Sequence, residues 1–169
     1  KRQVLDVVAA RLLDPSLSIL PFESKPPKYE AYLLKRAGDA AVAQALAEEI
    51  GFYRKALEVD PEYVGARLSL VSALMSWNKD AEASKELEVL EGGRVKLSPY
   101  QSHSVKGFRA WSRGQWDAAL VFSREMVRLA PGDARTLYTL ANDAYHADRP
   151  REALEVLGRD VDWSVMTQD

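Results

Sequence analysis

Residues 53–70 read YRKALEVDPEYVGARLSL, and residues 122–140 read FSREMVRLAPGDARTLYTL. Each stretch starts with the basic, amphipathic end of a helix and closes that helix with a proline, Pro61 or Pro131. Two residues follow each proline before a new run of helix-forming residues begins. Because proline cannot continue a helix interior, the two stretches predict the same junction, in which one helix ends and the next starts in the same register.

The residues around these junctions predict helices throughout. From Tyr29 onward the chain is rich in Ala, Leu, Glu, Lys and Arg, and it lacks the alternating β-branched clusters of strands. We therefore expect an all-α fold. Breaks between its helices are predicted at Gly38-Asp39, Asp60-Pro61, Asn78-Lys79-Asp80, Gly92-Gly93, Ser98-Pro99, Gly114, Pro131-Gly132-Asp133 and Asp148-Arg149-Pro150.

A small residue recurs near the start of the second helix in each predicted hairpin. These residues are Ala83, Ala119 and Ala153, and the last two are 34 positions apart. Alanine at such a position lets two helices approach closely. This period, with a turn inside each unit and a proline after it, resembles the tetratricopeptide repeat.

The resemblance is carried by residues in three units. The unit from Val64 supplies Leu70, Leu74 and Ala83 with Leu87; the unit from Tyr100 supplies Gly107, Ala119 and Pro131; the last supplies Leu137, Leu140, Ala141, Ala144 and Ala153 with Leu157. The sequence departs from the pattern at Arg67, His103 and Ser123, at the long linkage 92–99, and at Glu49, where an alanine is expected. The resemblance implies an α–α superhelix, a solenoid of about four helical hairpins, with the unit before Pro61 degenerate.

The chain divides into three predicted segments: an N-terminal helix and proline-rich lead-in at 1–28, helical repeats at 29–158, and a C-terminal cap or tail at 159–169. We expect Trp163 to cover the open apolar end of the solenoid, or the solenoid to continue in a longer protein. The start without methionine suggests a fragment with an attached upstream domain. The proline-containing stretches more distantly resemble helical-repeat regions of bacterial signalling and transcriptional regulators.

Composition bears on partners and chemistry. The formal charge of −2 offers no net attraction to nucleic acid, and the absence of cysteine excludes disulfides and thiolate metal sites. No apolar run is long enough to span a membrane, so we expect no membrane insertion. The compartment is left open, with the cytoplasm favoured over the periplasm.

The resemblance implies that the first helix of each hairpin lines a concave, partner-binding face. Helical spacing places ten candidate residues there: Leu68, Ser69, Ser72, Met75, Phe108, Trp111, Tyr138, Asn142, Tyr145 and His146, with Ser76 and Ser104 beside them. Rigid aromatic rings and amides suit an extended peptide or a docked helix. The alternative is that Phe108, Trp111 and Tyr138 pack in the core.

Other kinds of site find little support. A clamp for a C-terminal carboxylate would have only Asn142 and Arg135, and His103 and His146 lack the neighbours that a metal site needs, so we expect no cofactor. No nucleophile with an oriented base and no phosphate loop occurs, so we expect no catalytic activity. The basic cluster Arg109, Arg113, Arg124 and Arg128 either faces an acidic partner or is a solvated surface.

Two functional hypotheses remain. The first is a non-catalytic module that binds a peptide or partner protein on the concave face of the solenoid. The second is a regulatory or sensor segment of a larger bacterial signalling or transcription-regulating protein. The full-length gene product discriminates between them, because only the second requires an attached output domain.

Overall fold

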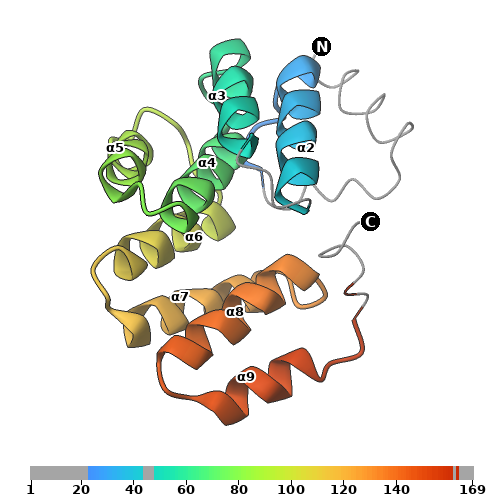
Figure 1. The fold of residues 1–169 in the computed structure, drawn as a ribbon, viewed down its shortest axis with the longest axis vertical. Helices are drawn as coiled ribbons and strands as arrows, with labels where there is room; N and C mark the ends of the chain where they lie inside the picture. Colours follow the sequence, from blue (N-terminus) through green and yellow to red (C-terminus); the bar gives the residue numbers. More distant parts are fainter. Residues whose placement is uncertain (1–22, 44–47, 162, 164–169) are drawn as a thin grey trace. The chain divides into compact units, whose positions relative to one another are not determined.

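The computed structural model describes residues 23–43, 48–161 and 163, and within these ranges it is all-helical (Figure 1). The predicted helix near the N-terminus and most of the proline-rich lead-in lie outside the described residues, as does most of the predicted tail. The helices are α2 (Tyr29–Ala43), α3 (Glu49–Val59), α4 (Val64–Ser76), α5 (Asp80–Glu91), α6 (Pro99–Trp111), α7 (Trp116–Leu129), α8 (Ala134–His146) and α9 (Pro150–Leu157). The all-α prediction is confirmed.

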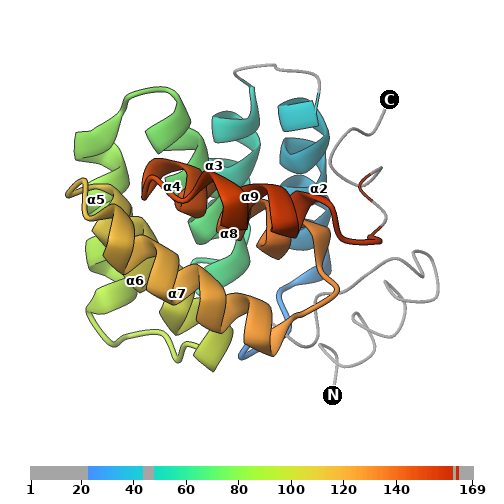
Figure 2. The same cartoon turned by 90° about the horizontal axis from the view of Figure 1, so that it is seen from below.

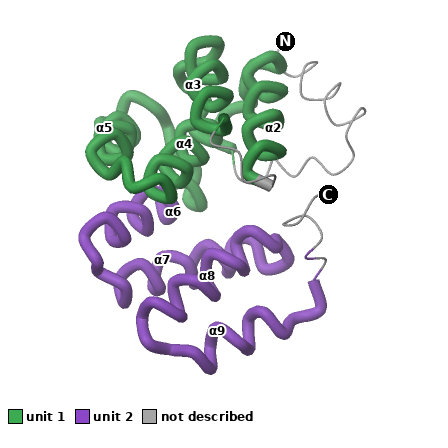
Figure 3. The backbone as a smooth tube through the Cα atoms, in the orientation of Figure 1, with its two compact units in different colours: residues 1–101 green, residues 102–169 purple. Residues whose placement is uncertain are grey.

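The chain forms two compact units, residues 1–101 and 102–169 (Figure 3). In unit 1, α2 packs against α3, α3 against α4 and α4 against α5. In unit 2, α7 packs against α8 and α8 against α9 (Figure 2). Helices that follow one another in sequence are thus neighbours in space, which is the arrangement of an α–α superhelix.

The apolar cores show why these helices stack. One cluster in unit 1 joins Ile50 and Tyr53 of α3 to Leu70 and Leu74 of α4 and to Ala83 of α5. The cluster of unit 2 likewise draws on α7, α8 and α9; its buried members are Leu120, Val127, Leu137, Leu140, Ala141, Ala144, Ala153 and Val156. Each core therefore needs three successive helices, because one helix pair leaves an apolar face in water.

The turns inside the hairpins repeat one geometry. Asn78, Gly114 and Asp148 each have a positive φ, of 55°, 65° and 57°. The residue after each donates its backbone N–H to the carbonyl five positions earlier, on Leu74, Ala110 and Ala144 respectively. This 6→1 bond defines the Schellman motif, and Gly, Asn and Asp tolerate its left-handed residue best. Ala83, Ala119 and Ala153, all buried, lie five residues after it in each hairpin, so the predicted common register holds.

One predicted break is wrong. Helix α2 runs through Gly38 and Asp39 without interruption. A Cβ on Gly38 would lie 2.5 Å from Cε1 of Tyr53, whose hydroxyl donates to Asp39 Oδ1 at 3.0 Å. Gly38 therefore provides room for the ring of the neighbouring helix, and packing outweighs the low helix propensity of glycine.

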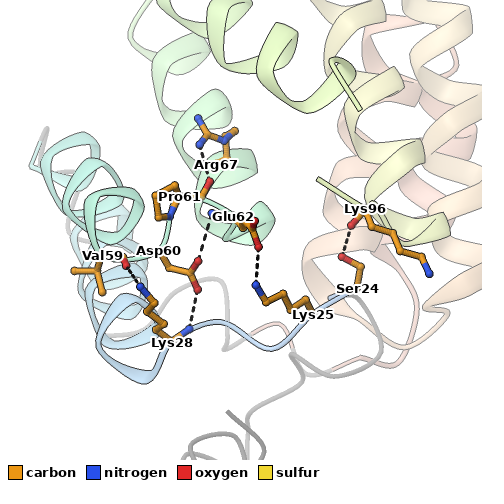
Figure 4. A network of polar contacts seen from close by, with 9 residues as sticks. All are labelled: Ser24, Lys25, Lys28, Val59, Asp60, Pro61, Glu62, Arg67 and Lys96. Carbon is orange, nitrogen blue, oxygen red and sulfur yellow. Dashed lines mark hydrogen bonds and ion pairs between the residues drawn. The ribbon is translucent and has the colours of Figure 1, made fainter. Parts of the chain in front are cut away.

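Residues 23–28 form a strap that ties two distant segments of unit 1 together (Figure 4). At one end Ser24 donates its hydroxyl to the carbonyl of Lys96. At the other end the Lys28 backbone N–H donates to Asp60 Oδ2 at 2.9 Å, and the Lys28 ammonium donates to the carbonyl of Val59 at 2.7 Å. Between them Lys25 pairs with Glu62 at 2.6 Å. The strap thus joins the α3–α4 turn to the linker before α6.

Glu23 anchors the strap at the first turn of α4. Its Oε2 accepts a hydrogen bond of 2.6 Å from Gln101 Nε2, and the backbone N–H of Gly65 also donates to its carboxylate. A Cβ on Gly65 would lie 2.1 Å from Glu23 Oε1, so glycine is needed for this approach. Free N–H groups at a helix start attract an anion. Burial nevertheless raises the Glu23 pKa to about 7, against the lowering effects of Lys35, Gln101 and Gly65.

Candidate functional site

The repeated turn allows the predicted partner-binding residues of different helices to be compared, by counting positions back from its left-handed residue. Positions three, six and ten before the left-handed residue hold Met75, Ser72 and Leu68 in α4, Trp111, Phe108 and Ser104 in α6, and Tyr145, Asn142 and Tyr138 in α8. Residues at this spacing lie on one side of a helix. The predicted candidates therefore occupy equivalent stripes on three first helices, with Ser69 and His146 beside them.

The α8 stripe, defined as Tyr138, Asn142 and Tyr145, is the most exposed of the three. Tyr138 is 51% exposed and Tyr145 is 68% exposed, while Asn142 is partly buried. The other side of α8 carries the buried Leu137, Leu140, Ala141 and Ala144 of the unit 2 core. Packing on that side fixes the helix, so the two phenol rings are presented on a rigid support, and Tyr138 is not a core residue.

The stripes on α4 and α6 are less open. In unit 1, Ser72 is exposed, Leu68 and Ser69 are partly buried, and Met75 packs against the core cluster of α3, α4 and α5. In unit 2, Phe108 is partly buried, and Ser104 is only 6% exposed and bonds to Met126 Sδ at 3.5 Å. The expectation that Ser104 faces a partner is therefore wrong, because α7 covers it.

Beside the α8 stripe, the rings of Trp111, Trp116 and His146 form a ring cluster. The centroid of Trp111 lies 4.8 Å from that of Trp116 and 4.7 Å from that of His146, both with edge-on geometry. Trp116 and His146 are 5.2 Å apart, and the ring of Tyr145 lies 5.5 Å from His146. Edge-to-face pairs of this kind are favourable and hold the rings in fixed positions. The ring cluster thus continues the α8 stripe onto α6 and α7.

A buried carboxylate, that of Asp143, holds one ring of the ring cluster in place. Its side chain is on α8 and only 3% exposed, and its Oδ1 accepts a hydrogen bond from the Trp111 indole N–H. Burial raises the pKa of Asp143, whereas the hydrogen bonds from Trp111 and Ser123 and the charge of His146 lower it. A buried carboxylate that accepts an indole N–H fixes the plane of that indole. Asp143 is therefore a positioning residue for Trp111.

Unit 1 contains a similar pair on different helices. Trp77, at the end of α4, donates its indole N–H to Glu49 Oε1 at 2.6 Å, and Glu49 is 4% exposed. Glu49 Oε2 has no hydrogen-bond partner among the residues that the structure describes. Glu49, which departs from the repeat pattern in the sequence, thus has a structural partner in Trp77. Trp77 lies two residues after Met75 of the α4 stripe.

Sequence reasoning missed Trp116 and Asp143. Trp116 begins α7 just after the turn at Gly114, so its closeness to Trp111 is set by the turn. Asp143 lies between Leu140, Ala141 and Ala144, and an acid within such an apolar helical pattern is the sign that could have identified a buried, bonded carboxylate.

The histidines and the acids do not gather into a metal site in the described part of the chain. No group of three or more His, Cys, Asp or Glu side chains there could hold a metal ion. His103 lies near Phe122, with ring centroids 6.2 Å apart, whereas His146 belongs to the ring cluster. Among the same residues, no helix is both long and apolar enough to cross a membrane.

Comparison with known proteins gives no family to which these features can be assigned. Neither the models of known protein families nor the curated proteins include a match to this chain.

Proposed function

We propose that this chain is a non-catalytic, tetratricopeptide-like interaction module that binds a peptide or a segment of a partner protein. One observation carries the proposal: the α8 stripe presents two tyrosines, 51% and 68% exposed, on the side of a helix whose other side is packed in the core. Exposed aromatic rings on one side of a rigid helix are typical of binding hot spots.

The chemistry of the α8 stripe favours an extended or helical segment with apolar side chains. Tyr138 and Tyr145 are two helical turns apart, about 10 Å at 1.5 Å rise per residue. A docked helix presents side chains on one face at the same spacing of seven residues, and an extended peptide covers this distance in about three residues, at 3.3 Å per residue. Asn142, between the two rings, has an amide that can both donate to and accept from a peptide backbone. The two rings supply apolar contact area, and the hydrogen bonds of the amide fix the orientation of the bound peptide backbone.

A peptide array with the purified protein tests this proposal. Peptides that bind are measured by fluorescence anisotropy against wild type and against the double variant Tyr138→Ala/Tyr145→Ala. Loss of two hot-spot rings, at about 1–2 kcal/mol each, weakens binding by at least tenfold. Because both rings are exposed, the melting temperature should stay near that of wild type.

A matched control removes apolar area elsewhere in unit 2. Val121 on α7 and Leu154 on α9 are 53% and 70% exposed, and Val121→Ala/Leu154→Ala should bind the selected peptides as wild type does. Equal affinity of the tyrosine variant and wild type would show that the α8 stripe is not the binding surface. Phe108→Ala and Trp111→Ala are weaker tests, since both rings are partly buried and the Trp111 indole also donates a hydrogen bond to the buried carboxylate of Asp143.

A further inference from the structure

Unit 2 contains a groove, the α7–α9 groove, which is lined by residues of α7 and α9, by Leu140 of α8 and by the turn between α8 and α9. Its volume is about 830 Å³, within the range of roughly 300–1,000 Å³ that is usual for ligand sites. Its lining includes the apolar Val127, Leu140 and Val156, which are at most 9% exposed and form its floor. Five arginines also line it: Arg124, Arg128, Arg149, Arg151 and Arg159.

The arginines of the groove differ in what they contact. Arg124 donates from Nε and Nη2 to the two carboxylate oxygens of Glu152, at 2.8 and 2.6 Å, so its guanidinium is fixed by a two-point contact. Arg149 pairs with Asp117 at 3.0 Å, and Arg128 pairs with Glu125 at 2.9 Å.

Arg151 and Arg159 are exposed, and neither has an ion-pair partner within the described ranges. Arg151 lies in the first turn of α9, and Arg159 lies two residues after that helix ends at Leu157; both line the groove. The groove therefore offers two guanidinium groups that have no ion-pair partner in the described part of the chain, together with its apolar floor.

The α7–α9 groove is separate from the α8 stripe. Leu140 lies two residues after Tyr138 in α8, and two residues correspond to a rotation of about 200° around a helix. The floor of the groove and the stripe are therefore on opposite sides of α8. A partner in the groove does not compete for the tyrosines, so this surface is independent of the proposed function.

We propose that the α7–α9 groove binds an acidic segment of a partner protein in which carboxylates alternate with apolar side chains. Guanidinium groups form two-point hydrogen bonds with carboxylates, and the apolar floor gives burial to the residues between them. Three carboxylates also line the groove, those of Asp148, Glu152 and Glu155. They repel a continuous run of phosphates, and the chain as a whole carries a formal charge of −2, so the arrangement suits spaced negative charges better than a nucleic acid.

The test uses a fluorescein-labelled peptide of alternating glutamate and leucine residues, its glutamine analogue, and a labelled oligothymidylate of the same length. Binding to the full chain is measured by anisotropy at low and at physiological salt. The glutamate peptide should bind, more weakly at higher salt, and the other two should bind at least about tenfold more weakly.

Paired variants locate the site. Arg151→Glu/Arg159→Glu reverses the charge of these two arginines, and we expect it to lower the affinity for the glutamate peptide by about tenfold or more. Arg94→Glu/Arg113→Glu makes the same change of net charge at exposed residues that do not line the groove, and we expect affinity within about twofold of wild type, allowing for long-range screening. Tyr138→Ala/Tyr145→Ala should bind this peptide as wild type does.

The proposal is overturned if the glutamate peptide does not bind to wild type, if both arginine double variants lose affinity equally, or if the oligothymidylate binds as tightly as the peptide. All these variants change exposed side chains, so their circular dichroism spectra should match that of wild type. A groove variant that keeps wild-type affinity would likewise exclude the groove.

Discussion

Replacing Glu23 by glutamine should remove a pH-dependent loss of stability from unit 1. Burial raises the Glu23 pKa from its ordinary value of 4.5 to about 7. Between these two values the folded chain holds a proton that the unfolded chain has released. The contribution of Glu23 to the unfolding free energy is therefore fully present below pH 4.5, and it is lost as the pH rises through 7.

The magnitude follows from the size of the shift. One pKa unit corresponds to about 1.4 kcal/mol, so a shift of about 2.5 units costs the folded state about 3 kcal/mol once Glu23 is ionised. Glutamine stays neutral at every pH. It keeps one oxygen acceptor, whereas the carboxylate accepts from both Gln101 and Gly65. The unfolding free energy of the variant therefore also differs from that of wild type by an amount that does not depend on pH.

Urea unfolding of wild type and Glu23→Gln, followed by circular dichroism from pH 4.5 to pH 8, measures the effect. The difference in unfolding free energy, variant minus wild type, should rise by about 3 kcal/mol over this range. Other titrating groups are the same in both proteins, so their contributions cancel in the difference. Glu30→Gln removes the charge of an exposed carboxylate in the same unit and serves as the control.

Two further measurements probe the buried carboxylate directly. Carboxyl NMR of Glu23 in the folded chain should show a titration midpoint near 7. In Gly65→Ala the new Cβ occupies the position of Glu23 Oε1 and should push the carboxylate out toward water, which lowers that midpoint. A Glu23 midpoint near 4.5 in wild type, or stability curves for wild type and Glu23→Gln that run parallel, would refute the raised pKa and its cause.

Three other substitutions test the packing. Trp163 packs against the unit 2 core, so Trp163→Ala should cost about 1–3 kcal/mol and lower the melting temperature; an unchanged melt would remove the capping role. Gly38→Ala should also lower the melting temperature, by about 1 kcal/mol of stability, because crowding of the Tyr53 ring exceeds the gain in helix propensity; a higher melting temperature would contradict the close approach. Asp143→Ala should cost about 2–3 kcal/mol in chemical denaturation, and Asp143→Asn less, because asparagine still accepts from Trp111; equal losses would mean that this bond does not matter.

The local elements of this protein could be predicted from its sequence. Pro61, Pro131 and Pro150 mark helix boundaries by their backbone chemistry alone. Asn78, Gly114 and Asp148 occupy the left-handed turn positions, which Gly, Asn and Asp tolerate better than other residues. The common spacing from these turns also placed the α8 stripe on one face, since a helix has a fixed period.

Tertiary structure decided the environment of individual side chains. Gly38 looks like a helix break in the sequence, yet Tyr53 from the next helix needs the space above it. Tyr138 and Ser104 occupy equivalent positions, but Tyr138 is 51% exposed and Ser104 is 6% exposed because α7 covers it. Helical periodicity fixes the side of a helix on which a residue lies. Only the packing of the neighbouring helix determines whether that side is open, because the covering side chains come from another helix and do not follow the period of the helix they cover.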